Sequence, residues 1–60
     1  MPVVTVDMLE GRTEEQKKVL VEGITATFGK IGVKPDVLNI IIREVSRNNW
    51  ALNGKTFAEK

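Results

Sequence analysis

The side chains of this 60-residue chain offer few routes to chemistry. Cysteine and histidine are both absent, which excludes disulfides, thiolate and histidine-assisted nucleophiles, and nearly all zinc sites. No glycine-rich phosphate-binding motif occurs either. Asp7 and Glu10 could act as a carboxylate pair, but solvated side chains at the end of a strand are the more ordinary interpretation. Lys17 and Lys18 are also expected to be solvated, and neither a metal nor a cofactor is expected.

Pro2 is the remaining candidate, because an amino-terminal proline is a base that needs no side chain. Initiator methionine is generally removed before a small residue, which would leave Pro2 with a free secondary amine. In an apolar pocket near a cation, the pKa of that amine falls and the amine becomes a suitable general base. The alternative is structural, since proline at the start of an edge strand loses no ladder hydrogen bond. The residues alone favour the structural interpretation.

A strand and then a helix are expected to position these residues. Residues 2–9 are rich in β-branched side chains and alternate between two faces, which is typical of a strand. Thr13 and Gln16 have the spacing of a capping box, so a helix is expected to begin there and run to about Lys30. Gly32 is a suitable residue to end it. One face of this helix is apolar: Leu20, Ile24, Phe28 and Ile31.

A second strand and a turn-rich segment complete the chain. Residues 38–45 are predicted as a strand with two apolar faces, because residues 40–42 are three consecutive isoleucines. Residues 46–49 are polar and predict a turn, and Asn53-Gly54 is a strong tight-turn pair. Residues 56–60 are expected to form a short tail.

The lengths of these elements predict how they are arranged. The first strand would span about 26 Å, and the helix about 25 Å. The helix can therefore return the chain along the first strand, which leaves the second strand parallel to it in one β-α-β unit. The fold class is α+β, and residues 1–60 form a single domain. A two-stranded sheet with an uncovered face, in so short a chain, predicts an obligate oligomer.

The composition also bears on partners. The chain has 9 Lys+Arg and 8 Asp+Glu, for a net charge of +1, which argues against binding to nucleic acid. No apolar run approaches the roughly 20 residues that span a bilayer, so no membrane association is expected. The amino terminus lacks the basic-then-apolar order of a signal peptide. A cytoplasmic protein is therefore expected.

Several segments together form a recognisable pattern. The amino-terminal proline and strand lead into Leu9-Glu10-Gly11-Arg12, and the capped helix then carries Glu15-Gln16-Lys17. The pattern continues through residues 40–45, Trp50 and Gly54. Over nearly the whole chain it resembles the 4-oxalocrotonate tautomerase family. The resemblance implies the tautomerase fold, a β-α-β unit with a C-terminal β-hairpin, assembled as a homo-oligomer that is commonly a hexamer (a trimer of dimers).

The resemblance also implies roles for three residues. Pro2 matches the family's catalytic proline, the general base that moves a proton within an enol or dienol acid. Arg12 matches the arginine that binds a substrate carboxylate or polarises its carbonyl, which suits the planar fork of a guanidinium group. Trp50 stands where the family has an aromatic residue that keeps the pocket apolar. From the residues alone, Arg12 could be a solvated loop residue and Trp50 a core or interface aromatic.

Asn39 is a departure from the family's pattern. Family members that act on 4-oxalocrotonate carry a second arginine early in the second strand, which binds the other substrate carboxylate, and Asn39 takes that position. Arg43 is about 13 Å farther along the strand and is not an obvious substitute. Arg47, in a turn, is another candidate. Asn39 can hydrogen-bond a substrate but has no charge, so a weaker or different substrate preference is expected, for example for a monoacid enol.

Geometry adds an expectation that is independent of the family. Pro2 begins the first strand and Arg12 follows its end, so they lie about 26 Å apart or more within one chain. If both serve one site, Arg12 must come from a neighbouring subunit. Asn39 begins the parallel second strand and should lie at the Pro2 end.

The predicted function is tautomerisation, an enol–keto isomerisation of a small unsaturated 2-hydroxy or 2-oxo acid, with Pro2 as general base. One alternative is a cofactor-independent dehalogenase or hydratase of a small unsaturated acid, with protonated Pro2 as general acid. That chemistry usually needs an acidic residue to activate water, and none is evident in the sequence. The other alternative is a non-catalytic oligomer that keeps the fold. Retention of Met1 would favour it, because the Pro2 nitrogen would then be an amide.

Overall fold

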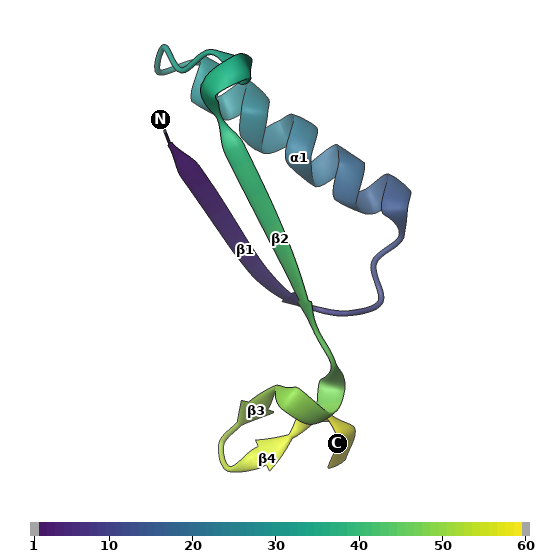
Figure 1. Cartoon of the computed structure of the whole chain (residues 1–60). Helices are drawn as coiled ribbons and strands as arrows, with labels where there is room; N and C mark the ends of the chain where they lie inside the picture. The colour runs from purple at the N-terminus through teal and green to yellow at the C-terminus, as the bar shows by residue number, and fades with distance from the viewer. Residues whose placement is uncertain (1, 60) are drawn as a thin grey trace.

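A computed structural model describes residues 2–59. Strand β1 (Val3–Leu9) leads into helix α1 (Glu14–Gly29), and strand β2 (Asn39–Val45) then returns parallel to β1. The strands pair from Val3 opposite Asn39 to Leu9 opposite Val45, and α1 covers one face of the sheet (Figure 1). The β-α-β prediction is confirmed, although each predicted strand begins one residue too early.

Local signals set both ends of α1. The Thr13 side chain accepts from the Gln16 backbone N–H and the Gln16 side chain accepts from the Thr13 backbone N–H, each at 3.0 Å, so the predicted capping box is present. At the other end, Gly32 adopts a φ of +90°, a conformation that glycine reaches at little cost. The Val33 N–H then donates to the Phe28 carbonyl, which closes the helix in the way typical of a glycine-terminated helix.

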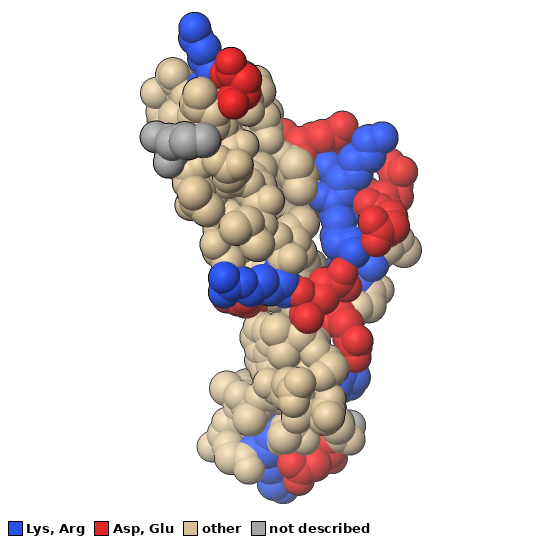
Figure 2. All heavy atoms as spheres, in the orientation of Figure 1, with Lys and Arg blue, Asp and Glu red and all other residues tan. Residues whose placement is uncertain are grey.

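The sheet has one covered and one uncovered face. Val4, Val6, Ile40 and Ile42 are half-buried beneath α1. On the opposite face, Val3 is 58% exposed and Ile41 is 44% exposed. None of residues 2–59 is fully buried in the single chain, so helix and sheet alone do not complete a hydrophobic core. Figure 2 shows charged side chains gathered over α1 and a surface over β1 and β2 that is uncharged except near the C-terminal ends of the two strands. Asp7 and Arg43, in register on this same face, carry opposite charges, and the exposed apolar residues beside them are suited to burial against another subunit.

A small hairpin follows β2 and lies apart from the helix and sheet (Figure 1). The short 3₁₀ helices η1 (Pro35–Val37) and η2 (Arg47–Asn49) precede β2 and the hairpin, respectively. Strands β3 (Ala51–Leu52) and β4 (Lys55–Thr56) pair antiparallel. Asn53 and Gly54 join them with φ angles of 56° and 80°, as the predicted tight turn requires.

The expectation of a tail over residues 56–60 is wrong for its described part. Thr56 belongs to β4, and Phe57–Glu59 form a third 3₁₀ helix, η3. The reason is that the Phe57 N–H donates to the Trp50 carbonyl at 2.8 Å and the two rings pack with centroids 6.3 Å apart. Lys60 lies outside the described residues. Among residues 2–59, no helix is long and apolar enough to cross a membrane.

Candidate active site

Pro2 and Asn39 lie side by side where the two parallel strands begin. The Asn39 backbone N–H donates to the Pro2 carbonyl at 3.1 Å, and Asn39 is in register with Val3. Pro2 is half-buried and Asn39 is exposed. The Pro2 carbonyl therefore takes part in the hydrogen bonding between the two strands, and the Pro2 nitrogen lies outside it. The predicted removal of Met1 concerns a residue that lies outside the described part of the chain.

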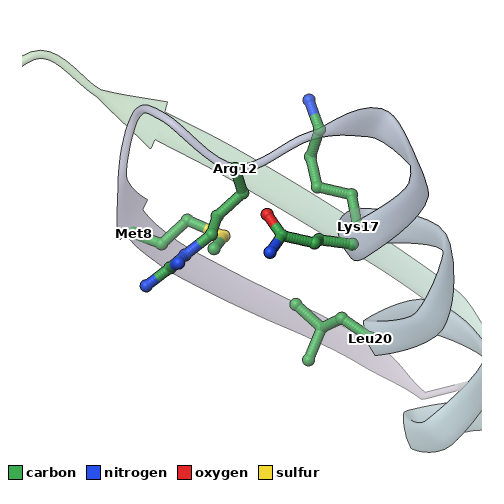
Figure 3. A pocket seen from close by; sticks show the side chains of 5 residues that line it. Met8, Arg12, Lys17 and Leu20 are labelled. Atoms are coloured by element: carbon green, nitrogen blue, oxygen red, sulfur yellow. The ribbon is translucent and has the colours of Figure 1, made fainter.

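Arg12 lies at the other end of β1, in the segment that leads to α1. Gly11 has a φ of +119° and allows the chain to turn there. Arg12 lines a pocket of about 280 Å³ together with Met8, Gln16, Lys17 and Leu20. Met8 and Leu20 supply an apolar floor. Figure 3 shows Arg12 extending past Met8, with its guanidinium group at the edge of the pocket. A carboxylate on an apolar body fits this combination of groups.

The prediction that Lys17 is solvated is wrong. Its side chain is 19% exposed, and its ammonium group forms ion pairs with Glu14 on the helix and Glu44 on β2. The hydrogen bond to Glu14, followed by that to Glu44, raises the pKa of Lys17 above its usual value. Because Glu14 is 94% exposed and Glu44 only 32%, water screens the Glu14 contact more strongly. Lys18 is exposed as predicted.

Trp50 belongs to the hairpin and packs on Phe57. Arg47 lies with its guanidinium carbon 5.8 Å from the centre of the Phe57 ring, and its Nη2 donates to the Phe57 carbonyl at 3.0 Å. Arg47 is thus held within the hairpin, which weakens its candidacy as a second carboxylate-binding group. The sequence interpretation missed Phe57, although continuing the strand pairing outward from the Asn53-Gly54 turn places position 57 opposite position 50.

A single chain does not bring the four predicted site residues together. Asn39 lies beside Pro2, as expected. Arg12 lies beyond the far end of β1, whose seven residues span about 23 Å. Trp50 follows β2 at that same far end. Arg43 pairs with Asp7 in the body of the sheet, away from Pro2. Among residues 2–59, no group of three or more potential ligands could hold a metal ion.

Comparison with protein families and curated proteins gives consistent matches. The family model described as "Tautomerase enzyme" matches residues 2–60. A probable tautomerase from Bacillus cereus is 48% identical over 61 residues, which covers 100% of both chains. The 2-hydroxymuconate tautomerase of Bacillus subtilis is 42% identical over 60 residues, which covers 98% of this chain and 97% of that protein.

Solved structures have the same fold. The crystal structure of YwhB, a homologue of 4-oxalocrotonate tautomerase, matches with a TM-score of 0.92 and 38% identity over 98% of each chain. A heterohexameric 4-oxalocrotonate tautomerase from Chloroflexus aurantiacus matches with a TM-score of 0.89 and 33% identity, covering 98% of this chain and 97% of that chain. The β-α-β unit with its C-terminal antiparallel pair is therefore shared with proteins of this kind.

Proposed function

The chain belongs to the tautomerase family, and on that premise we propose that this isomerase converts the enol form of a small unsaturated 2-hydroxy acid into its 2-oxo form. The observation that carries the proposal is the position of Pro2 directly before β1, with its carbonyl held by the Asn39 N–H. The nitrogen of Pro2 becomes a free secondary amine once Met1 is removed.

Pro2 moves the proton in this reaction. Its nitrogen takes the proton of the 2-hydroxyl group, so the O–H bond breaks as the N–H bond forms. The electron pair left on oxygen forms the C2 carbonyl group as the C2=C3 π bond breaks. The released π pair then takes a proton at C3, or at C5 when a C4=C5 double bond is conjugated to it. The prolinium ion then returns the proton to that carbon, which restores the free amine. No co-reactant is needed, and a base with a pKa near neutrality suits both steps.

Arg12 from a neighbouring subunit binds the substrate carboxylate. The distance along β1 keeps the Arg12 and Pro2 of one chain apart, and Met8 and Leu20 form an apolar floor beside Arg12. A guanidinium group can bind a carboxylate through two parallel hydrogen bonds. Trp50, which is half-buried against Phe57, keeps the shared site apolar and so favours the neutral form of Pro2.

Asn39 sets the preferred substrate, a monoacid with an apolar body. Asn39 lies beside Pro2 and offers an amide rather than a cation to the second end of the substrate. Arg43 is too far along β2, and Arg47 is held in the hairpin. A distal carboxylate would therefore find hydrogen bonds at Asn39 without a matching charge.

The working assembly is a homohexamer, built as a trimer of dimers. Support comes from the exposed apolar sheet face, with Val3 and Ile41 at its surface, and from the absence of any fully buried residue among those described. The Chloroflexus aurantiacus relative is a heterohexamer, which supports an assembly of six chains.

An ultraviolet assay of enol-to-keto conversion tests the proposal, with phenylenolpyruvate and 2-hydroxymuconate as substrates. Intact mass establishes whether Met1 is absent from the preparation. Pro2→Ala, or a form extended by one residue before Pro2, should lower kcat/KM by at least about a hundredfold, the low end for a general base. Sedimentation confirms that each variant remains assembled. Unchanged turnover in an assembled, extended form would show that Pro2 is not the base.

A further inference from the structure

Lys17 occupies an unusual position on α1. Apart from Lys17 and Thr25, the half-buried residues of this helix are apolar. Lys17 precedes Leu20 and Ile24 by three and seven positions on the same face. The Lys17 side chain is 19% exposed, whereas the adjacent Lys18 is exposed. A half-buried ion pair contributes little net stability but can hold two elements in one geometry. The Lys17 ion pair is therefore suited to orienting the elements that it joins.

The ion pair joins α1, which follows the Arg12 segment, to β2, which pairs with the strand that precedes it. Glu44, the inner partner of Lys17, is on β2 and is in register with Met8. The pair therefore ties the first turn of α1 to the last residues of the sheet. On the other side of Arg12, the Glu10 N–H donates to the Val45 carbonyl at 3.0 Å. Residues 11–16, which include Arg12, thus lie between two attachments to the neighbouring residues Glu44 and Val45 of β2.

The guanidinium group of Arg12 depends on this frame for its position. It makes no hydrogen bond or ion pair with any of residues 2–59, and Gly11 beside it has a conformation that only glycine adopts freely. Lys17 contributes its hydrocarbon chain to the wall of the same pocket. Figure 3 shows the Lys17 ammonium group directed away from Arg12 and the pocket. Lys17 therefore does not offer its charge to a ligand there.

We infer that Lys17 is a positioning residue: its ion pair with Glu44 holds the start of α1 against β2 and thereby fixes Arg12 where it meets the substrate carboxylate. This inference rests on the proposed function, in which Arg12 binds that carboxylate. It adds a residue that contacts no reacting atom and acts only through the backbone segment that carries Arg12.

Lys17→Met tests the inference, because methionine keeps an unbranched apolar side chain and removes the charge. With phenylenolpyruvate, KM should rise by about fivefold, the upper range for a single partly exposed ion pair. kcat should stay within about twofold, since Arg12 binds substrate and transition state alike. Glu44→Gln should have the same effect, and the double variant should be no worse than either single one. Lys17→Arg should restore KM, and Lys18→Met is the matched control that leaves it unchanged.

The Arg12→Ala background separates positioning from general damage to the fold. There, Lys17→Met should raise KM no further, whereas a loss of folding or assembly would still lower activity. If Arg12→Ala raises KM but neither Lys17→Met nor Glu44→Gln does, the positioning role is wrong and the proposed function stands. If Arg12→Ala leaves KM unchanged, the proposed role of Arg12 is wrong and the positioning role falls with it. Sedimentation of every variant identifies any that fail to assemble.

Discussion

Subunit mixing tests whether Pro2 and Arg12 act from different chains. The seven residues of β1 place these two residues about 23 Å apart or more, which is longer than a small enol acid. Pro2→Ala protein should be nearly inactive, and Arg12→Ala protein should turn over little substrate at concentrations far below its raised KM. When equal amounts are unfolded together and refolded, a site built from two chains has an intact Pro2 in half of cases and an intact Arg12 in half. About one quarter of sites should therefore recover, whatever the number of subunits.

Enol decay in the ultraviolet measures the recovery, with phenylenolpyruvate as substrate. A small mass tag on one variant lets native mass spectrometry confirm that mixed oligomers have formed. Each variant refolded alone gives the baseline. The matched control mixes Pro2→Ala with the double variant that carries both substitutions, since this pair assembles in the same way but contains no intact Pro2.

The mixing result can refute the distance argument directly. If the mixed oligomers are confirmed and their activity stays at the average of the two separate variants, no site has gained a residue from its neighbour. Nearly full activity of Arg12→Ala by itself would show instead that Arg12 takes no part. Either outcome would overturn the shared site, because one chain would then contain every group that the reaction needs.

Three further predictions concern the sheet face, Asn39 and Lys17. Ile41→Asp places a charge on the uncovered face, so sedimentation at micromolar concentration should show loss of the assembled form; an assembled, fully active variant would contradict burial of that face. Asn39→Arg should raise kcat/KM for 2-hydroxymuconate by about tenfold, a gain of roughly 1.4 kcal/mol, with little change for phenylenolpyruvate; an equal gain for both would exclude Asn39 as the discriminating residue. The raised pKa of Lys17 means that its ion pair contributes fully below pH 10.5 and is lost as the pH rises through the folded-state pKa. The difference in unfolding free energy between the wild type and Lys17→Met, measured against pH, should therefore shrink at alkaline pH, and a difference that grows would show that the sign is wrong.

The features that the sequence predicted correctly depend on neighbouring residues. The Thr13–Gln16 capping box, the stop at Gly32 and the Asn53-Gly54 turn each involve groups within a few positions of one another. Parallel pairing of β1 and β2 followed from lengths alone, because a helix as long as a strand returns the chain to its starting end. That inference also placed Asn39 beside Pro2, as the structure confirms.

The errors concern contacts between distant parts of the chain. Lys17 was expected in solvent because charged residues usually lie there, and its partner Glu44 is 27 positions away in sequence. Its spacing from Leu20 and Ile24 was the signal that could have placed it on the sheet-facing side. The sequence predicts Phe57 in a tail because residues 56–60 show no strand or helix periodicity. Only the pairing of β3 with β4 across the hairpin places Phe57 against Trp50.

The incomplete core and the divided site have one physical cause. A chain this short forms a two-stranded sheet with one helix, and such a unit covers only one face of the sheet. Strand β1 also separates Pro2, at its start, from Arg12, beyond its end. No later element of the described chain returns Arg12 to Pro2. Assembly through the uncovered face would bury Val3 and Ile41 and bring the ends of different chains together. Stability and catalysis would then depend on the same contacts, so a substitution at Ile41 should reduce both together.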